Sequence, residues 1–94
     1  MALTHTARSG DEIRIGHTRI LLLQASNGTA LLLVVEGEKR RKVHISGQDV
    51  HHLETGSVRL HWARRGAARL ALSAPPHIRI RCDSTRTAHA CTKQ

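Results

Sequence analysis

Aromatic side chains are almost absent from this sequence: it has one tryptophan, Trp62, and no phenylalanine or tyrosine. Leucine, valine, isoleucine and alanine must therefore supply the hydrophobic core. The absence also argues against RNA binding by stacking bases on aromatic side chains, as in the common four-stranded RNA-binding sheets. Any contact with a nucleic acid is expected to use cations, backbone amides and apolar pockets.

Cysteines and long apolar runs are also scarce. The two cysteines, Cys82 and Cys91, are fewer than the four or more that a secreted, disulfide-stabilised domain usually has. The N-terminal residues lack the basic and apolar regions of a signal peptide. The longest apolar run, 30–35, is too short to span a bilayer. We therefore expect a cytoplasmic protein with no membrane partner.

Acidic residues are outnumbered by basic ones. Lys and Arg total 15, Asp and Glu total 7, and the formal net charge is +8. Most of the cations are arginines, whose planar guanidinium groups grip phosphates and base edges. This composition favours a polyanionic partner. The 94 residues fit a single domain with a thin core, or one subunit of a small dimer.

The residue patterns that would support catalysis or metal binding are missing. No Gly-x-Ser-x-Gly sequence and no phosphate-cradling glycine motif occurs. Among the eight histidines, His51 and His52 are adjacent and face different ways. The set Cys82, His89 and Cys91 lacks the paired ligand spacing of a structural zinc site. We therefore expect no enzyme activity, no metal and no other cofactor.

Apolar residues mostly recur with a period of two, which is typical of strands with one face on a core and the other in water. The pattern places Trp62 on the same core-facing side as Val58 and Leu60. In three of the four alternating stretches the outward positions hold Arg or His, which predicts a basic sheet face. The four stretches are 12–15, 58–62, 69–72 and 78–81.

Two longer apolar runs, 20–23 and 31–35, predict central strands that are covered on both sides. Asn27 and Gly28 between them predict a tight hairpin turn, because both turn positions need positive φ. Glycines at intervals of about ten residues predict a meander of short strands. The fold class expected is therefore all-β, an antiparallel sandwich in a single domain over residues 1–83.

Two segments depart from the strand pattern. Residues 46–53 could form one short helix, with Ser46 as its N-cap and Val50 and Leu53 on a shared side. Residues 84–94 are polar and small, without a period, and are expected to form a flexible tail.

A weak internal repeat with an offset of 37 residues also runs through the chain. Residues 9–13 match 46–50, and Leu21 and Leu23 match Val58 and Leu60. Strands share alternation by default, so duplication and coincidence both stay open. The repeats would be residues 3–45 and 46–83.

Residues 3–16 resemble the opening of the carbon storage regulator family of bacterial translational regulators. The shared features are a first strand with Thr6 and Arg8, then Gly10 before an acid, then an apolar-x-apolar strand that ends at Gly16. Continuing without a gap places Asn27-Gly28 on the family's tight loop, and Val43-His44 on the Val-His pair of its fifth strand. Residues 56–83 resemble the later strands of the same family, with Ala74-Pro75 as the exit from the fourth.

The resemblance implies an RNA-binding post-transcriptional regulator that occupies GGA-bearing hairpins in mRNA leaders or small RNAs. It also implies an interlocked dimer whose first and fifth strands pair between subunits, with two basic edges that each take one RNA loop. The chain would then be a homodimer subunit or a single-chain pseudo-dimer whose units meet at 42–47. In the other layout, the first unit ends in the helix 46–53 and the rest is an extension.

The resemblance also supplies the candidate RNA-binding residues. One RNA-binding edge would combine the strand that contains residues 4–8 with the strand that contains residues 40–44. Arg79 and Arg81 would lie on the second edge. At the position of the family's main RNA-contacting arginine this chain has Ile45, and in the second copy Cys82, one residue after Arg81. The residues of the first edge are Thr4, His5, Thr6 and Arg8, with Arg40, Arg41, Lys42, Val43 and His44 beside them.

Two alternatives to RNA binding stay open. The chain could be a protein-interaction module that pairs with, or antagonises, a true carbon storage regulator. It could also be a basic DNA-binding protein that uses a β-ribbon.

Arg64 and Arg65, in a predicted loop, could grip a phosphate or simply form a solvated turn.

Overall fold

The computed structural model describes residues 2–47 and 49–83 and shows only strands and turns there. The predicted all-β class is confirmed. No helix within the described ranges is long and apolar enough to cross a membrane. The strands are β1 (Ala2–Arg8), β2 (Glu12–Ile15), β3 (Thr18–Ser26), β4 (Thr29–Glu36), β5 (Lys39–Ser46), β6 (Val50–His52), β7 (Ser57–Arg64), β8 (Ala67–Ser73) and β9 (Ile80–Asp83).

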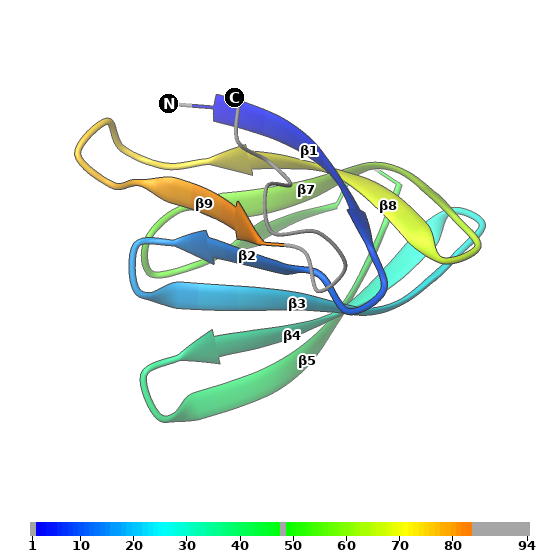
Figure 1. Cartoon of the computed structure of the whole chain (residues 1–94), viewed down its shortest axis with the longest axis horizontal. Helices are drawn as coiled ribbons and strands as arrows, with labels where there is room; N and C mark the ends of the chain where they lie inside the picture. The colour runs from blue at the N-terminus through cyan, green and yellow to red at the C-terminus, as the bar shows by residue number, and fades with distance from the viewer. Residues whose placement is uncertain (1, 48, 84–94) are drawn as a thin grey trace.

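The strands form two antiparallel sheets that pack face to face (Figure 1). Sheet A has the order β1-β8-β7-β6, and sheet B has the order β5-β4-β3-β2-β9. The first and last strands each cross to the other half of the chain. Leu3 of β1 lies opposite Leu72 of β8, and Cys82 of β9 lies opposite Ile13 of β2. Each sheet therefore contains strands from both halves.

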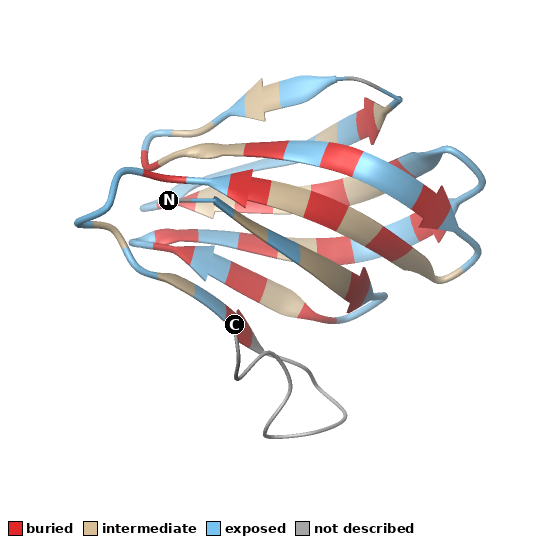
Figure 2. Ribbon diagram, turned by 90° about the horizontal axis from the view of Figure 1, so that it is seen from above, coloured by how far each residue is buried: buried red, intermediate tan, exposed pale blue. Residues whose placement is uncertain are grey.

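The core is a layer of aliphatic side chains between the two sheets. Buried and exposed positions alternate along the strands (Figure 2), as the period of two predicts. Burial of one such side chain contributes roughly 1.5–3 kcal/mol, so a core of this kind needs no aromatic residue. The largest fully buried side chains are Ile13, Ile15, Thr18, Ile20, Leu22, Leu32, Val34, Ile45, Val58, Leu70 and Leu72.

Trp62 does not lie in this core, so that part of the strand prediction is wrong. A β-bulge interrupts the β7–β8 pairing between Leu60 and Trp62, and Trp62 then pairs with Arg69. A bulge adds one residue to a strand and so reverses which face the following residues occupy. Trp62 consequently lies on the outer face of sheet A, 37% exposed, and Ala63 takes the core position.

The two long apolar runs form central strands, β3 and β4 of sheet B, but they are covered on one side only. Their alternate residues Ile20, Leu22, Leu32 and Val34 are buried between the sheets. The other residues of both runs are half-buried or, at Leu23, 38% exposed. The expectation of cover on both sides is wrong because the described chain builds two layers and no third.

The helix predicted at 46–53 is also wrong. Val50–His52 forms β6, in which Val50 pairs with Arg59 of β7. Ser46 ends β5, and its backbone N–H and its hydroxyl each lie 3.3 Å from Oδ2 of Asp49 in a turn. Pairing with β7 satisfies the backbone of a segment that is poor in strong helix formers. The layout with a helical end to the first unit is thereby excluded. The tail expected at 84–94 lies outside the described residues.

The two halves of the chain occupy equivalent places in the two sheets, with a spacing of 38 residues. Gly28 and Gly66 both occupy hairpin turns with positive φ. The Gly28 N–H donates to the Ala63 carbonyl and the Gly66 N–H donates to the Ala25 carbonyl, each at 3.1 Å. The sequence offset of 37 is therefore one residue short. The offset of 37 matches buried Leu60 with exposed Leu23. The spacing of 38 in the structure matches Leu60 with buried Leu22.

Gly56 lies where two backbone segments meet before β7. A Cβ atom at this position would overlap the backbone carbonyl oxygen of Ser73, which cannot move aside as a flexible side chain could. We predict that Gly56→Ala lowers the free energy of unfolding by about 2 kcal/mol or more, as measured by urea denaturation. Gly37→Ala is the matched control, because φ is +64° there but nothing lies within 4 Å. It should cost only about 1 kcal/mol. Equal losses in the two variants would contradict the close approach.

Candidate nucleic-acid interface

The candidates on β1 divide between its two faces. Thr4, Thr6 and Arg8 lie on the outer face of sheet A. His5 pairs with buried Leu70 and so faces the space between the sheets. Burial lowers the pKa of His5, although the negative charge of Asp11 opposes this. His5 is therefore neutral near pH 7 and does not add a cation to the outer surface.

The candidates on β5 divide in the same way. Arg40, Lys42 and His44 pair with half-buried residues of β4 and share its outer face. Arg41 and Val43 pair with buried residues of β4 and face inward. Nη1 of Arg41 lies 2.9 Å from Oε1 of Glu36, whose side chain is 2% exposed. Arg41 is thus committed to a structural ion pair.

The expected grouping of β1 with β5 is wrong. The two strands belong to different sheets. They are equivalent strands of the two sheets, since Ala7 of β1 and Ile45 of β5 are 38 residues apart and both are buried. The start of β1 instead lines a groove of about 530 Å³ with residues 76–80, which lead into β9. Arg79 and Arg81 therefore lie on the β1 side of the molecule. Arg41, by contrast, contacts His51 of β6 at 3.3 Å.

The positions of the family's RNA-contacting arginine point into the core. Ile45 is 2% exposed and Cys82 is 7% exposed. Their neighbours His44 and Arg81 are exposed on the outer face of sheet B. Arg81 thus cannot take the place of an arginine at 82, because adjacent residues of a strand face opposite ways.

Four arginines form one row across the outer face of sheet B. Arg81 of β9 pairs with Arg14 of β2, which pairs with Arg19 of β3. Arg19 pairs with Val35 of β4, and Val35 pairs with Arg40 of β5. We call these five residues the arginine row. It joins the predicted candidates Arg40 and Arg81, which the sequence had placed on separate edges.

Glu12 holds the centre of the arginine row together. Its Oε2 accepts hydrogen bonds from Nε of both Arg14 and Arg19. The hydrogen bond from Arg19 lowers the pKa of Glu12 most, and Arg14 adds to the effect. Like charges on directly opposed residues destabilise a sheet, and this carboxylate offsets that repulsion. Within the described chain, the Nη groups of both arginines stay available for another anion.

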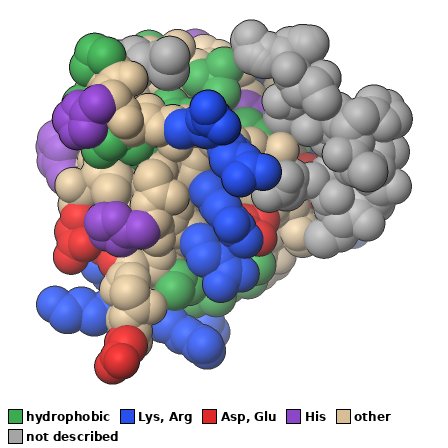
Figure 3. Space-filling view, turned by 60° about the vertical axis from the view of Figure 1, so that its left-hand side comes forward, with side chains coloured by type: hydrophobic (Ala, Val, Ile, Leu, Met, Phe, Trp, Pro, Cys, Tyr) green, Lys and Arg blue, Asp and Glu red, His purple; other side chains and the backbone are tan. Residues whose placement is uncertain are grey.

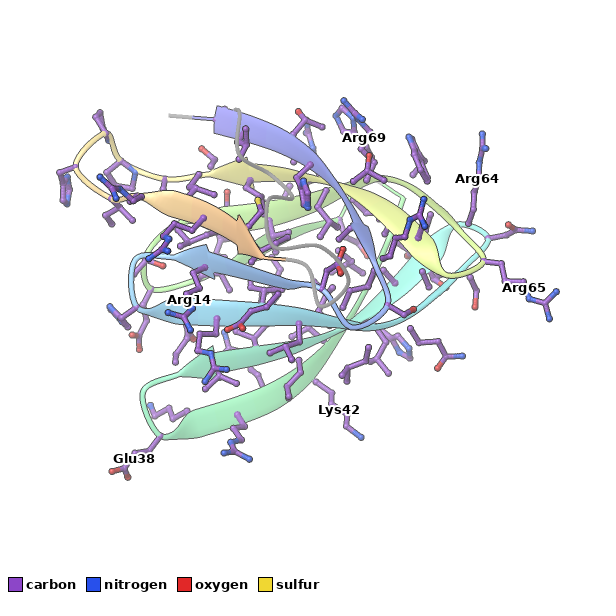
Figure 4. The ribbon with its side chains drawn as sticks, viewed as in Figure 1. Arg14, Glu38, Lys42, Arg64, Arg65 and Arg69 are labelled. Atoms are coloured by element: carbon purple, nitrogen blue, oxygen red, sulfur yellow. The ribbon has the colours of Figure 1, made fainter. Side chains whose placement is uncertain are left out.

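Figure 3 shows Lys and Arg side chains gathered in a stripe on the side of the molecule that carries the hairpin turns at 16–17 and 37–38. Figure 4 shows Arg14 projecting from β2 and Lys42 from β5. The sequence reasoning did not include Arg14 or Arg19 among the candidates. Alternation marked Arg14 as an outward residue, but only the register of five strands shows which outward residues are neighbours.

No group of three or more His, Cys, Asp or Glu side chains suited to a metal ion occurs in the part of the chain that the structure describes. No protein-family model, curated protein or solved structure matches this chain. The interface must therefore be judged from its own geometry and charge.

Glu36 is the buried acid that forms the ion pair with Arg41. Besides Arg41, its Oε2 accepts a hydrogen bond from the backbone N–H of Glu54 at 2.8 Å and lies 3.4 Å from the hydroxyl of Thr18. The Thr55 hydroxyl donates to the carbonyl of Ile15 at 2.6 Å beside them. Burial alone raises the pKa of Glu36, but the Glu54 N–H, Arg41 and Thr18 outweigh it and hold the pKa below 4.5.

We predict that Glu36→Gln destabilises the fold by about 1–3 kcal/mol at pH 7, because charge-assisted hydrogen bonds to a buried group are lost. The folded pKa of Glu36 is lowered, so its contribution is complete above the unfolded pKa and is lost as pH falls through the folded pKa. The difference in unfolding free energy between wild type and variant should therefore shrink below pH 4.5. Urea denaturation at pH 7 and pH 3 measures it.

Glu38→Gln is the matched control for this prediction. Glu38 is exposed in the β4–β5 turn and projects into solvent (Figure 4). Its substitution should change stability by less than about 0.5 kcal/mol at either pH. If both variants lose the same stability, or if the loss at Glu36 persists unchanged at pH 3, the role assigned to Glu36 is wrong.

Proposed function

We propose that this protein is an RNA-binding post-transcriptional regulator without catalytic activity, which binds RNA through the arginine row. The observation that carries the proposal is the row itself, in which four guanidinium groups from four strands are aligned on one sheet face. Arginine is well suited to phosphate because its rigid fork donates two parallel hydrogen bonds.

The dimensions of the row favour a nucleic acid strand over a small anion. Five adjacent strands at about 4.8 Å spacing give it a length of roughly 19 Å. A nucleic acid strand laid across the arginine row would place several successive phosphates beside its guanidinium groups. Lys42 lies one row away on the same face, and Arg79 precedes β9 on the same side. The excess of 15 cations over 7 acids would draw such a polyanion to the surface.

The strand exchange supports the carbon storage regulator reading of the sequence. The resemblance implies an interlocked dimer whose first and fifth strands pair between subunits. In this chain β1 pairs with β8 of the second half, and β9 pairs with β2 of the first half. A single chain with this topology would act as a pseudo-dimer, with β5 as the strand shared between its halves.

The mechanism we propose is steric. The bound protein would cover a GGA-bearing hairpin in an mRNA leader or a small RNA, and so hide or expose the ribosome-loading site. No part of this mechanism needs a cofactor or a bond-breaking step. Because Ile45 and Cys82 are buried, RNA contact in this protein would rest on the arginine row instead of the family's usual arginine.

One observation favours a second function, a protein-interaction module that pairs with or antagonises a true carbon storage regulator. Leu21, Leu31 and Leu33 form a half-buried apolar strip beside the arginine row on the outer face of sheet B. Leu33→Gln would separate the two functions, because it removes an apolar side chain without adding a charge beside the arginine row. It should disrupt protein pairing, measured by analytical ultracentrifugation with the partner, and should leave phosphate contacts in place.

We predict that Arg40→Gln with Arg81→Gln weakens RNA binding and flattens its salt dependence. Neither side chain takes part in an ion pair with a described residue, so the fold should stay intact. Loss of two phosphate contacts should reduce the slope of log K against log salt by about 1.4 for a single strand. Anisotropy of a labelled GGA-bearing hairpin between 50 and 200 mM salt gives the slope.

Arg65→Gln is the matched control, because Arg65 is exposed in the β7–β8 turn, outside the arginine row. It should leave the slope within error of wild type. A slope that is flat in the wild-type protein would disprove the proposal as a whole. A DNA hairpin of the same sequence bound equally well would favour the DNA-binding alternative, since RNA readout depends on the 2′-hydroxyl and on loop shape.

A further inference from the structure

The outer face of sheet A is basic and carries no acidic residue in its described positions. Arg8 of β1 and Arg64 of β7 lie in one row, on either side of Ala67 of β8. The next row contains Arg69 of β8, and the row beyond contains Arg59 of β7. This face lies on the opposite side of the molecule from the arginine row. The surface residues of its four rows are Ala2, Thr4, Thr6, Arg8, Val50, His52, Ser57, Arg59, Trp62, Arg64, Ala67, Arg69, Ala71 and Ser73.

Trp62 lies in the middle of this basic face. The residue is 37% exposed, and the guanidinium carbon of Arg64 lies 5.1 Å from the centroid of its ring. Arg69 pairs with Trp62 across the strands and donates a hydrogen bond of 3.1 Å from Nη1 to the hydroxyl of Thr6 on β1. Figure 4 shows Arg64 and Arg69 on this side of the molecule. The single tryptophan of the chain is thus exposed and next to two cations.

The equivalent surface of sheet B shows that the fold does not need Trp62. Gln24 is the equivalent of Trp62 at the spacing of 38, and each residue directly follows a β-bulge in its strand. Gln24 pairs with Leu31 of β4, and Trp62 pairs with Arg69 of β8. Leu21 and Leu31 stand where sheet A has Arg59 and Arg69, and Ser26 stands where it has Arg64. The same backbone therefore accepts neutral residues at all four places. A tryptophan ringed by arginines is a property of this surface and not of the packing.

We propose that Trp62 stacks on an unpaired base of single-stranded RNA, while Arg59, Arg64 and Arg69 contact the flanking phosphates. The inference rests on the proposed function for its ligand class, and it adds a second contact surface on the other sheet. Every base has a π face, so one exposed indole binds single strands with little sequence preference. Arg64 holds the indole in place and supplies positive charge where the backbone of the strand would pass.

The path of the strand continues toward β1. Thr6, Arg69 and Trp62 form one continuous row, and Arg8 lies in the next row. From β7 to β1 the row spans two strand spacings, roughly 10 Å, a short step along a nucleic acid chain. An RNA anchored at Trp62 would therefore reach Thr4, Thr6 and Arg8, the outward candidates on β1. The geometry gives those three residues a role separate from the arginine row.

Trp62 is the only fluorophore among the aromatic side chains, so its emission reports on this site alone. We expect a 12-nucleotide oligouridine RNA to quench Trp62 emission in a saturable way, with the Kd that anisotropy of the labelled RNA gives. The same length of duplex RNA should not quench, because its bases are already stacked. Trp62→Leu should weaken binding of the single strand roughly tenfold or more, and Trp62→Phe should retain most of it.

The controls separate this inference from the proposed function. Arg64→Gln should weaken binding of the single strand, whereas Arg65→Gln, one residue further into the turn, should not. RNA binding by anisotropy with no change in Trp62 emission would overturn the stacking site and leave the proposed function standing. Absence of binding by both readouts would overturn both. Quenching by polyphosphate, which has no bases, to the same extent as by RNA would also overturn stacking.

Discussion

The arrangement of the two sheets depends on one buried carboxylate. Glu36 ends β4 in sheet B, and it binds Arg41 of the neighbouring strand and the backbone of Glu54, which lies between β6 and β7 of sheet A. A buried acid is costly unless it is paired and fully hydrogen-bonded, so this group fixes the geometry of everything around it. It also holds one cation of the basic run in an ion pair. Arg41 lies within a run of four basic residues, yet it serves the fold and not the interface.

The two halves of the chain share one scaffold and differ in what they display. The residues of sheet A that are equivalent to the arginine row at the spacing of 38 are small or neutral. Among them are Ser57, Ser73 and Ala2. The Trp62 surface of sheet A has Gln24 and leucines as its counterparts in sheet B. Outward residues of a strand are free to change without disturbing the core. One backbone plan thus supports two different basic surfaces on opposite sides of the molecule.

Sequence patterns predicted the strands well and the surfaces less well. Period-two alternation and the Asn27-Gly28 turn are local signals, and the structure confirms the strands and the hairpin that they predict. The bulge before Trp62 leaves no comparable local signal, so the residue was assigned to the wrong face. The neighbours of Arg14 across the sheet could not be known without the register of five strands. Val50 formed a strand because β7 offered a partner, which is a tertiary effect.

The crossing of β1 to the far half of the chain bears on how the protein is made. β1 is synthesised before its partner β8, and the six strands β2 to β7 lie between them along the chain. The backbone hydrogen-bonding groups of nascent β1 therefore stay unpaired within the chain until β8 has been synthesised. Pairings so distant in sequence close slowly and leave unpaired edges that can associate with other chains. Its threonines and Arg8 keep this waiting strand polar on one face, which lowers the risk of aggregation during synthesis.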